Sequence, residues 1–317
     1  MRTFSARLLL SLMVLVGVAF VLLWLRLGIH KEVFYEDDWL DSPLTRDINI
    51  DNPNRLVSMS IPNPTPAQKL QPVMVLVHGF SASTFEFESF KKAMSASEPS
   101  VLFSNVILGG HGQDHEAFRR ATYADWLAPI VAEVQALVAL GYERIYMVGL
   151  STGATGILHV LLDGLLPTES LRGLFFVDIF ITPKDTNLHI VPYIQYVVKN
   201  TRSGASRPIE TRHWYVNRPT SALVQLLALT KTVQTQLTQD AQRNTPPILL
   251  FTSDNDPTSD TIGSDVVAKA IPNAKVIRYE SNRHIIVEPQ AKRDWTDEDQ
   301  ANFDSVISAI VLAMSKK

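Results

Sequence analysis

Residues 144–156 read RIYMVGLSTGATG. The apolar run that ends at Gly149 is typical of a buried strand, and the residues after Gly153 begin a helix-like segment. Between them stands Gly149-x-Ser151-x-Gly153, the pattern of a nucleophile elbow, in which a serine occupies a strained strand-to-helix turn. Glycines at the flanking positions avoid a collision between a side chain and the neighbouring backbone. The stretch therefore predicts Ser151 as a nucleophile at the carboxyl end of a strand.

Unbroken apolar runs recur on both sides of this turn. Because their apolar residues are continuous rather than alternating, they are typical of strands buried on both faces of a parallel sheet. The runs are VMVLV (73–77), VLFSNVIL (101–108), RIYMVG (144–149), LFFV (174–177), ILLF (248–251) and KVIRY (275–279). Helix-like segments separate them, so the sequence predicts an α/β fold with a mostly parallel, doubly wound sheet.

Two of the helix-like segments carry clear signals. Thr122 and Asp125 have the spacing of a capping box, and Gly141 is a plausible C-terminal stop for the helix that would begin there. Near the end of the chain, apolar residues recur at i, i+3, i+4 spacing, which predicts a final helix packed on the sheet. That stripe consists of Phe303, Val306, Ile307, Ile310, Val311 and Met314.

The alternation is interrupted from residue 182 to about 245, where no convincing sheet strand appears. A connection of this length is too long for an ordinary loop, so we expect an inserted, partly helical cap over one end of the sheet. The chain then divides into an N-terminal segment (1–30), a stalk with the first strands (31–70), in which 56–61 is a candidate strand, and a main domain (71–317).

The first 30 residues differ from the rest. The uncharged run Leu8–Leu25 spans roughly 18 residues, which is at the lower edge of what crosses a bilayer core. Arg7 and Arg26 flank it, and Trp24 stands where an interfacial aromatic side chain would. Because a poor cleavage site follows, we expect an uncleaved single-pass membrane anchor, with a cleaved signal or a buried core helix as alternatives. The short N-terminal tail favours a main domain outside the cytoplasm, although positive charges on the two flanks nearly balance.

Composition excludes several classes of function. The formal net charge is −3 without a basic stripe, so a nucleic-acid partner is not expected. The chain contains no cysteine, which removes disulfides, thiolate metal sites and a cysteine nucleophile. Hydrophobic residues make up 46% and charged residues 19% of the chain, enough for a sizeable buried core.

A serine nucleophile of this kind needs a histidine base, which should follow it in chain order. Four histidines follow Ser151. His159 falls inside the helix after the elbow, and His189 and His213 fall in the expected cap. His284 follows the last strand run on a loop at the carboxyl end of the sheet, so we predict it as the general base.

The acid that orients the histidine should stand between the serine and the histidine. Asp256 lies just beyond the run ILLF and precedes a proline that ends the strand. Asp254 is a nearby alternative, and Asp178, inside LFFVDIF, is another because an acid one strand earlier also occurs in such sites. We predict Asp256 and keep both alternatives open.

Backbone N–H groups should stabilise the oxyanion. The run VMVLV ends in His78-Gly79-Phe80, where one donor is expected, from Phe80; the other is the N–H of Thr152, directly after the nucleophile. His78 itself is expected to order this loop rather than to act as a base.

These motifs together resemble the carboxylesterase and monoacylglycerol-lipase branch of the α/β-hydrolases over roughly residues 72–315. The resemblance rests on HGF (78–80), GGHG (109–112), T-x-x-D-W-L (122–127), GYERIYMVGLSTG (141–153), SDNDP (253–257) and NRH (282–284). It implies an α/β-hydrolase fold with a cap that shapes the acyl pocket, a triad of Ser151, Asp256 and His284, and a structural role for His111. Two departures are Thr152, where a larger apolar residue is common, and the second acid in SDNDP.

The resulting expectation is a serine hydrolase that cleaves short-to-medium acyl or monoacylglycerol-like esters through an acyl-enzyme, with no metal and no organic cofactor. Its partners would be a small-molecule or lipid ester and the membrane. Acyl transfer, thioester hydrolysis or aminopeptidase chemistry would use the same triad, and a non-catalytic membrane-tethered scaffold is a further alternative.

Overall fold

The computed structural model describes residues 11–20, 57–58, 64–113, 115–203, 213–239, 245–289 and 294–315. Of the expected anchor Leu8–Leu25, only 11–20 belong to the described part, where they form a helix with exposed side chains. No helix in these ranges is both long and apolar enough to span a bilayer. The remainder of the expected anchor and most of the expected stalk (31–70) lie outside the described residues.

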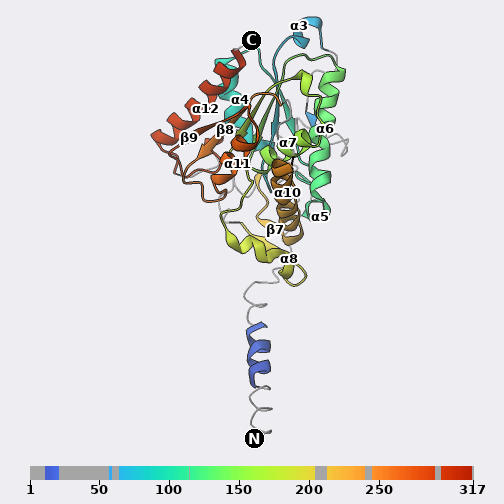
Figure 1. Ribbon diagram of the computed structural model, residues 1–317, viewed down its shortest axis with the longest axis vertical. Coiled ribbons are helices and arrows are strands. Elements are labelled where there is room, and N and C mark those ends of the chain that lie inside the picture. The colour runs from blue at the N-terminus through green and yellow to red at the C-terminus, as the bar shows by residue number, and fades with distance from the viewer. Residues whose placement is uncertain are drawn as a thin grey trace.

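The core of the protein is a seven-stranded sheet with the strand order β1-β3-β2-β4-β5-β8-β9 (Figure 1). The strands are β1 (Val57–Ser58), β2 (Val73–Val77), β3 (Leu102–Val106), β4 (Ile145–Leu150), β5 (Leu171–Val177), β8 (Ile248–Ser253) and β9 (Ala274–Tyr279). Only β1 runs antiparallel to its neighbour among these paired strands. The prediction of a mostly parallel sheet built from the six apolar runs is thus confirmed.

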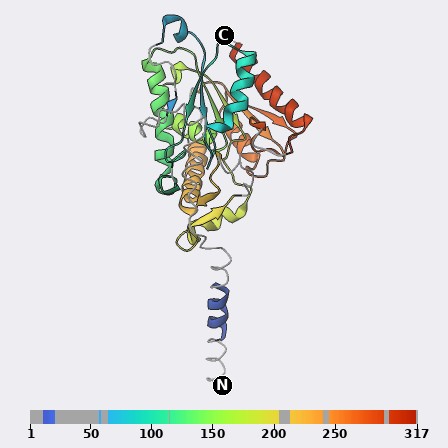
Figure 2. The same cartoon turned by 180° about the vertical axis from the view of Figure 1, so that it is seen from behind.

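Helices cover both faces of this sheet. One face carries α4 (Glu88–Ser97) and α12 (Asp297–Ser315), and the other carries α6 (Tyr123–Ala139), α7 (Thr152–Leu162) and α11 (Ile262–Ala270) (Figures 1 and 2). Successive residues of β2 enter different cores: Val75 packs with the α6 and α7 side chains, whereas Met74 packs with those of α4 and α12. This two-sided burial explains why the strand sequences are apolar throughout.

The predicted helix signals are confirmed in their structural detail. The Thr122 side chain accepts from the backbone N–H of Asp125, whose carboxylate accepts from the N–H of Thr122 in return, so the capping box of α6 is complete. Gly141 follows this helix with φ 86°, a conformation that glycine adopts without strain. In α12, five of the six residues in the predicted stripe are buried, and Val311 is partly buried against the same core.

The segment between β5 and β8 forms a cap at the carboxyl end of the sheet. It contains η3 (Thr186–Ile190), α8 (Val191–Ile194), β6 (Asn200–Arg202), β7 (Asn217–Pro219) and α10 (Thr220–Gln239), which packs along α7. Strands β6 and β7 pair antiparallel in a separate sheet. Neither strand joins the main sheet, and the sequence did not reveal them because each is only three residues long (NTR and NRP) and leaves no hydrophobic pattern.

Short helical elements complete the described part. They are α3 (Pro66–Lys69), η1 (Thr84–Phe87), α5 (His115–Arg120) and η2 (Thr168–Ser170). Of these, η1 matters for the site, because it follows the loop at the carboxyl end of β2. The carboxyl ends of β2, β4, β5 and β8 and the loop after β9 therefore converge at one edge of the sheet, beneath the cap.

Candidate active site

Ser151 occupies a strained turn between β4 and α7. Its backbone has φ 52° and ψ −115°, a combination that costs a residue with a side chain of the order of 1–3 kcal/mol. The strain is held by the surrounding structure: the Ser151 N–H donates to the Val177 carbonyl at 2.9 Å, and the Ser151 carbonyl accepts from the Thr155 N–H at 3.1 Å. The side chain is therefore presented at the edge of the sheet rather than buried in a strand.

The two elbow glycines are required by close backbone approach. A Cβ on Gly153 would lie 2.2 Å from the Val77 carbonyl oxygen, and a Cβ on Gly149 would lie 2.5 Å from the Ala154 Cα. Both obstacles are main-chain atoms that cannot rotate away. The glycines of the motif therefore allow β4, the turn and α7 to pack against the end of β2.

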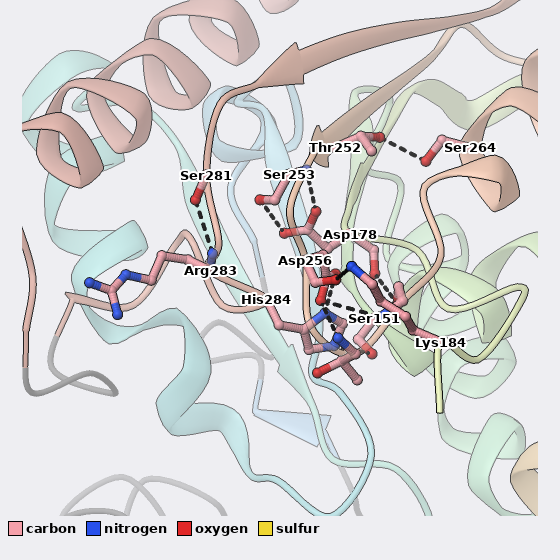
Figure 3. A network of polar contacts seen from close by, with 12 residues as sticks. Ser151, Asp178, Lys184, Thr252, Ser253, Asp256, Ser264, Ser281, Arg283 and His284 are labelled. Atoms are coloured by element: carbon pink, nitrogen blue, oxygen red, sulfur yellow. Dashed lines mark hydrogen bonds and ion pairs between the residues drawn. The ribbon is translucent and has the colours of Figure 1, made fainter. Parts of the chain in front are cut away.

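The structure brings Ser151, His284 and Asp256 into one chain of hydrogen bonds (Figure 3). His284 Nε2 lies 2.8 Å from Ser151 Oγ, and His284 Nδ1 lies 2.6 Å from Asp256 Oδ2. A carboxylate can only accept, so Nδ1 donates to Asp256 and Nε2 accepts from the serine hydroxyl. This leaves the imidazole ready to remove the proton of Ser151.

The three candidate acids have different partners. Asp256, 1% exposed, faces His284. Asp254 instead pairs with Arg278 at the surface, with 2.6 Å between its Oδ1 and Nη1. Asp178 lies behind Asp256 and accepts from the backbone N–H of Ser253 at 2.7 Å (Figure 3). Among the three, only Asp256 reaches the histidine.

Asp256 and His284 are each held by a second set of contacts. The Asp256 Oδ1 accepts from the backbone N–H groups of Thr258 at 2.7 Å and Ser259 at 3.2 Å, which leaves Oδ2 for the histidine. Beside His284, Arg283 points the opposite way (Figure 3) and pairs with Asp299 at the start of α12, with 2.9 Å between Nη2 and Oδ2. The loop that carries the histidine is thus tied to the body of the domain.

Burial and nearby charges shift the pKa values of His284 and Asp178. Burial alone would lower the pKa of His284, but the hydrogen bond and charge of Asp256, with the charge of Glu86, raise it above its usual range. Burial and the neighbouring Asp256 raise the pKa of Asp178 to about 8. Asp178 is therefore mostly protonated at neutral pH, and a single negative charge on Asp256 is left facing the histidine.

The expected oxyanion donors lie on either side of Ser151. Within the described residues, neither the Phe80 N–H nor the Thr152 N–H donates a hydrogen bond to another protein group. The peptide that carries the Phe80 N–H is oriented by His78, whose Nδ1 donates to the Gly79 carbonyl at 2.8 Å. Since N–H and C=O of a trans peptide point in opposite directions, this bond also sets the direction of the Phe80 N–H.

The other histidines have different surroundings. Burial lowers the pKa of His78 to about 4, and its Nε2 accepts from the Leu108 N–H at 3.1 Å. His111 is buried among aromatic rings, and burial lowers its pKa well below the usual range. The other candidates that follow Ser151 in the chain have different surroundings: His159 contacts Gln236, His189 is exposed, and His213 stacks on Phe85. Across the ranges that the structure describes, no cluster of three or more His, Asp and Glu side chains is suited to holding a metal ion.

Two buried carboxyl groups near the site had no role assigned from the sequence. Asp178 was considered only as an alternative acid, whereas the structure shows it bonded to Ser253. Glu86, in η1, is 2% exposed and accepts from the backbone N–H of Gly79 at 2.6 Å. Nothing in the stretch STFEFESF marks one of its glutamates as buried, so no sequence signal pointed to Glu86.

Comparisons with known proteins identify the family of this fold. The family model of the alpha/beta hydrolase fold matches residues 72–230, just over half of the chain. The chain therefore belongs to the α/β-hydrolase fold family, and its relatives make it lipase- and esterase-like within that family.

Several relatives are lipolytic enzymes. The chain is 24% identical over 219 residues to a thermostable monoacylglycerol lipase of Bacillus sp. (strain H-257), a match that covers 67% of this chain and 82% of the relative. The structure described for LipS and LipT, metagenome-derived lipolytic enzymes, aligns with a TM-score of 0.62 at 16% identity, covering 78% of this chain and 96% of that one. A monoglyceride lipase of Saccharomyces cerevisiae, solved with a substrate analogue, also gives 0.62, at 14% identity with 80% and 88% coverage.

Proposed function

We propose that this protein is a serine hydrolase that cleaves carboxylic esters through an acyl-enzyme on Ser151. The observation that carries the proposal is the hydrogen-bond chain from Ser151 Oγ through His284 to Asp256. This arrangement of nucleophile, base and orienting acid activates a hydroxyl for acyl transfer.

In the first half of the reaction, Ser151 Oγ attacks the ester carbonyl carbon while its proton moves to His284 Nε2. The carbonyl oxygen becomes an oxyanion beside the N–H groups of Phe80 and Thr152, which donate to no other group among the described residues. The imidazolium is stabilised by Asp256. Collapse of the tetrahedral intermediate breaks the bond to the alkoxy oxygen, which takes the proton from His284 and leaves as the alcohol.

In the second half, a water molecule attacks the acyl-enzyme. His284 again accepts a proton, now from the water, and returns it to Ser151 Oγ as the acyl bond breaks. The products are a carboxylic acid and the free enzyme. If an alcohol or amine takes the place of water, the same residues perform acyl transfer, so the acceptor must be established by experiment.

For the substrate, we propose a short-to-medium acyl ester or a monoacylglycerol-like ester. The support comes from the monoacylglycerol lipase relative and from the cap over the carboxyl end of the sheet. The test is to assay the full chain in detergent micelles with p-nitrophenyl esters of two to twelve carbons and with monoacylglycerols. Release of fatty acid and alcohol is the expected result. A folded chain that cleaves thioesters or peptides but none of these esters would contradict the proposal.

The rate of hydrolysis should depend on the protonation of His284. The base must be neutral to accept the serine proton, and its pKa is raised by the charges of Asp256 and Glu86. We therefore expect kcat/KM to fall as the pH decreases, with an apparent pKa above the ordinary histidine value of 6.5. The measurement is a pH profile of kcat/KM, with enzyme pre-incubated at each pH and assayed again at pH 8 to exclude unfolding. The fall of kcat/KM on the acid side of the profile is called the acid limb. An acid limb with an apparent pKa below 6.5 would show that the charges around His284 do not act as described.

We further propose that Leu8–Leu25 anchors the chain in a membrane, with the hydrolase domain outside the cytoplasm. The apolar run and its flanking arginines support this, as do the exposed side chains of Tyr193 and Tyr196 on the cap, since tyrosine favours the lipid–water interface. The full chain expressed in bacteria should stay with the membranes after an alkaline carbonate wash. Protease added to spheroplasts should digest the domain. Release by the wash contradicts the anchor, and protection from protease contradicts the orientation.

A further inference from the structure

Glu86 lies against the loop that carries the expected oxyanion donor. Its carboxylate is buried and bridges two parts of the fold: Oε2 accepts from the Gly79 N–H at 2.6 Å, and Oε1 accepts from the Trp214 Nε1–H at 2.8 Å. Gly79 directly precedes Phe80, and a Cβ at Gly79 would lie 3.4 Å from the Cβ of Ser151. The carboxylate therefore holds the backbone within a few ångströms of the nucleophile.

The residue Gly79 is bound at both of its polar groups. Glu86 holds its N–H, and His78 Nδ1 holds its carbonyl. That carbonyl belongs to the peptide whose N–H is the one on Phe80. Two fixed points on consecutive peptides leave the Phe80 N–H little freedom to turn away from an oxyanion beside Ser151.

Hydrogen bonds connect this loop and η1 to the cap. In addition to the Trp214 bond, the Tyr215 N–H donates to the Ser81 carbonyl at 2.8 Å, and Arg218 Nε donates to Ser81 Oγ at 3.0 Å. The ring of His213 stacks on that of Phe85 with 3.8 Å between the centroids. The cap segment His213–Arg218 thus lies directly on the loop and on η1.

The negative charge of Glu86 reaches both the cap and the base. It acts to raise the pKa of Arg218 against the lowering effect of burial. It also contributes, with Asp256, to the raised pKa of His284. A buried charge is costly unless it is paired and hydrogen-bonded, and here the Gly79 and Trp214 N–H donors and the charge of Arg218 supply that compensation.

We propose that Glu86 is a positioning residue for the hydrolysis: it holds the oxyanion loop through Gly79 and couples that loop to the cap through Trp214. This inference rests on the proposed function. The reacting atoms do not touch Glu86, which acts through the Phe80 peptide.

The test compares Glu86→Gln with wild type in the full chain, using p-nitrophenyl butyrate and a fluorophosphonate probe. Both carboxylate oxygens accept N–H donors, whereas an amide accepts through one atom and turns an NH2 toward the other donor. We expect kcat to fall by about ten-fold or more with KM changed by less than about three-fold, because misplacement affects the transition state more than binding. Labelling should slow in parallel. The acid limb of the pH profile should move to lower pH, because one negative charge near His284 is lost.

Two further variants make the result specific. Glu133→Gln changes another buried glutamate, 1% exposed and bonded to Ser104 away from the site, and should keep kcat and the acid limb of wild type. Trp214→Phe keeps an aromatic ring, though a smaller one, and removes the N–H that donates to Glu86. It should lower kcat by about three- to ten-fold, a smaller effect because the Gly79 bond remains.

The outcomes separate this inference from the proposed function. A wild-type chain that neither turns over esters nor reacts with the probe contradicts both. An active wild type together with a folded Glu86→Gln variant of equal kcat and unchanged acid limb contradicts only the role of Glu86. If Glu86→Gln does not fold while Glu133→Gln does, the test rests on Trp214→Phe. A kcat of Trp214→Phe within two-fold of wild type then overturns the inference.

Discussion

Replacing Ser151 by alanine is expected to lower kcat for ester hydrolysis by about 10⁴- to 10⁶-fold, the range found when the nucleophile of a serine triad is removed. The only atom deleted is Oγ, which lies 2.8 Å from His284 Nε2. Alanine meets the same backbone strain as serine at φ 52°, so the elbow should be preserved. Fluorophosphonate labelling followed by gel fluorescence is the direct measurement, and the label should disappear.

A matched control for this experiment is Ser308→Ala. Ser308 is exposed on α12, and its hydroxyl donates only to the Asp304 carbonyl one helical turn away. The control should label and turn over like wild type. Labelling that persists in a folded Ser151→Ala variant would place the nucleophile elsewhere. A wild type that is folded but does not label would remove the support for an acyl-enzyme.

Replacing Asp256 by asparagine is expected to lower kcat by about 10⁴-fold with little change in fold, as for the orienting acid of other serine triads. The carboxylate Oδ2 accepts from His284 Nδ1 at 2.6 Å. An amide turned to donate at that position stabilises the wrong tautomer, with the proton on Nε2, which can then no longer accept from Ser151. The loss of charge also destabilises the imidazolium. The measurement is kcat at the pH optimum, with thermal unfolding to verify the fold.

The two other acids provide the comparison. Asp254→Asn removes a surface pair with Arg278 and should leave kcat within about two-fold, because exposed pairs contribute little. Asp178→Asn should keep kcat within about ten-fold, because an amide resembles the protonated carboxyl that a pKa of about 8 implies at neutral pH. A greater loss in Asp178→Asn than in Asp256→Asn would transfer the orienting role to Asp178.

The Asp178→Asn variant should also change how the stability of the protein depends on pH. The folded-state pKa of Asp178, about 8, lies above its ordinary value of 3.8, so the neutral carboxyl stabilises the fold fully below the ordinary value, and this contribution is lost progressively as the pH rises to about 8. Asparagine cannot ionise. The melting temperature of Asp178→Asn relative to wild type should therefore increase between pH 5 and pH 8 and level off at higher pH.

Much of the scaffold could be predicted from local sequence. The strands of a sheet buried on both faces are continuous apolar runs, and six such runs correspond to six of the seven strands. The capping box at Thr122 and Asp125 was readable because it involves only neighbours in the chain. Strands β6 and β7 were not, since three polar residues held by backbone pairing and cap packing leave no periodic signal.

The site divides in the same way. The motif Gly149-x-Ser151-x-Gly153 predicts a nucleophile turn from sequence alone, because the motif itself contains the glycines that the tight turn requires. The local sequence favoured Asp256 but left Asp178 and Asp254 open as alternatives, since all three follow strands that end at the same edge of the sheet.

Short-range patterns were thus enough to predict the succession of the main strands and helices along the chain and the position of the nucleophile. This is because burial on both faces and turn geometry depend mainly on neighbouring residues. The packing of distant segments decided which carboxylate faces His284 and placed Glu86 between the Gly79 N–H and the Trp214 ring nitrogen. These contacts depend on distances of about 3 Å between atoms from separate parts of the chain. Such distances are set only when the sheet, the loops and the cap have come together.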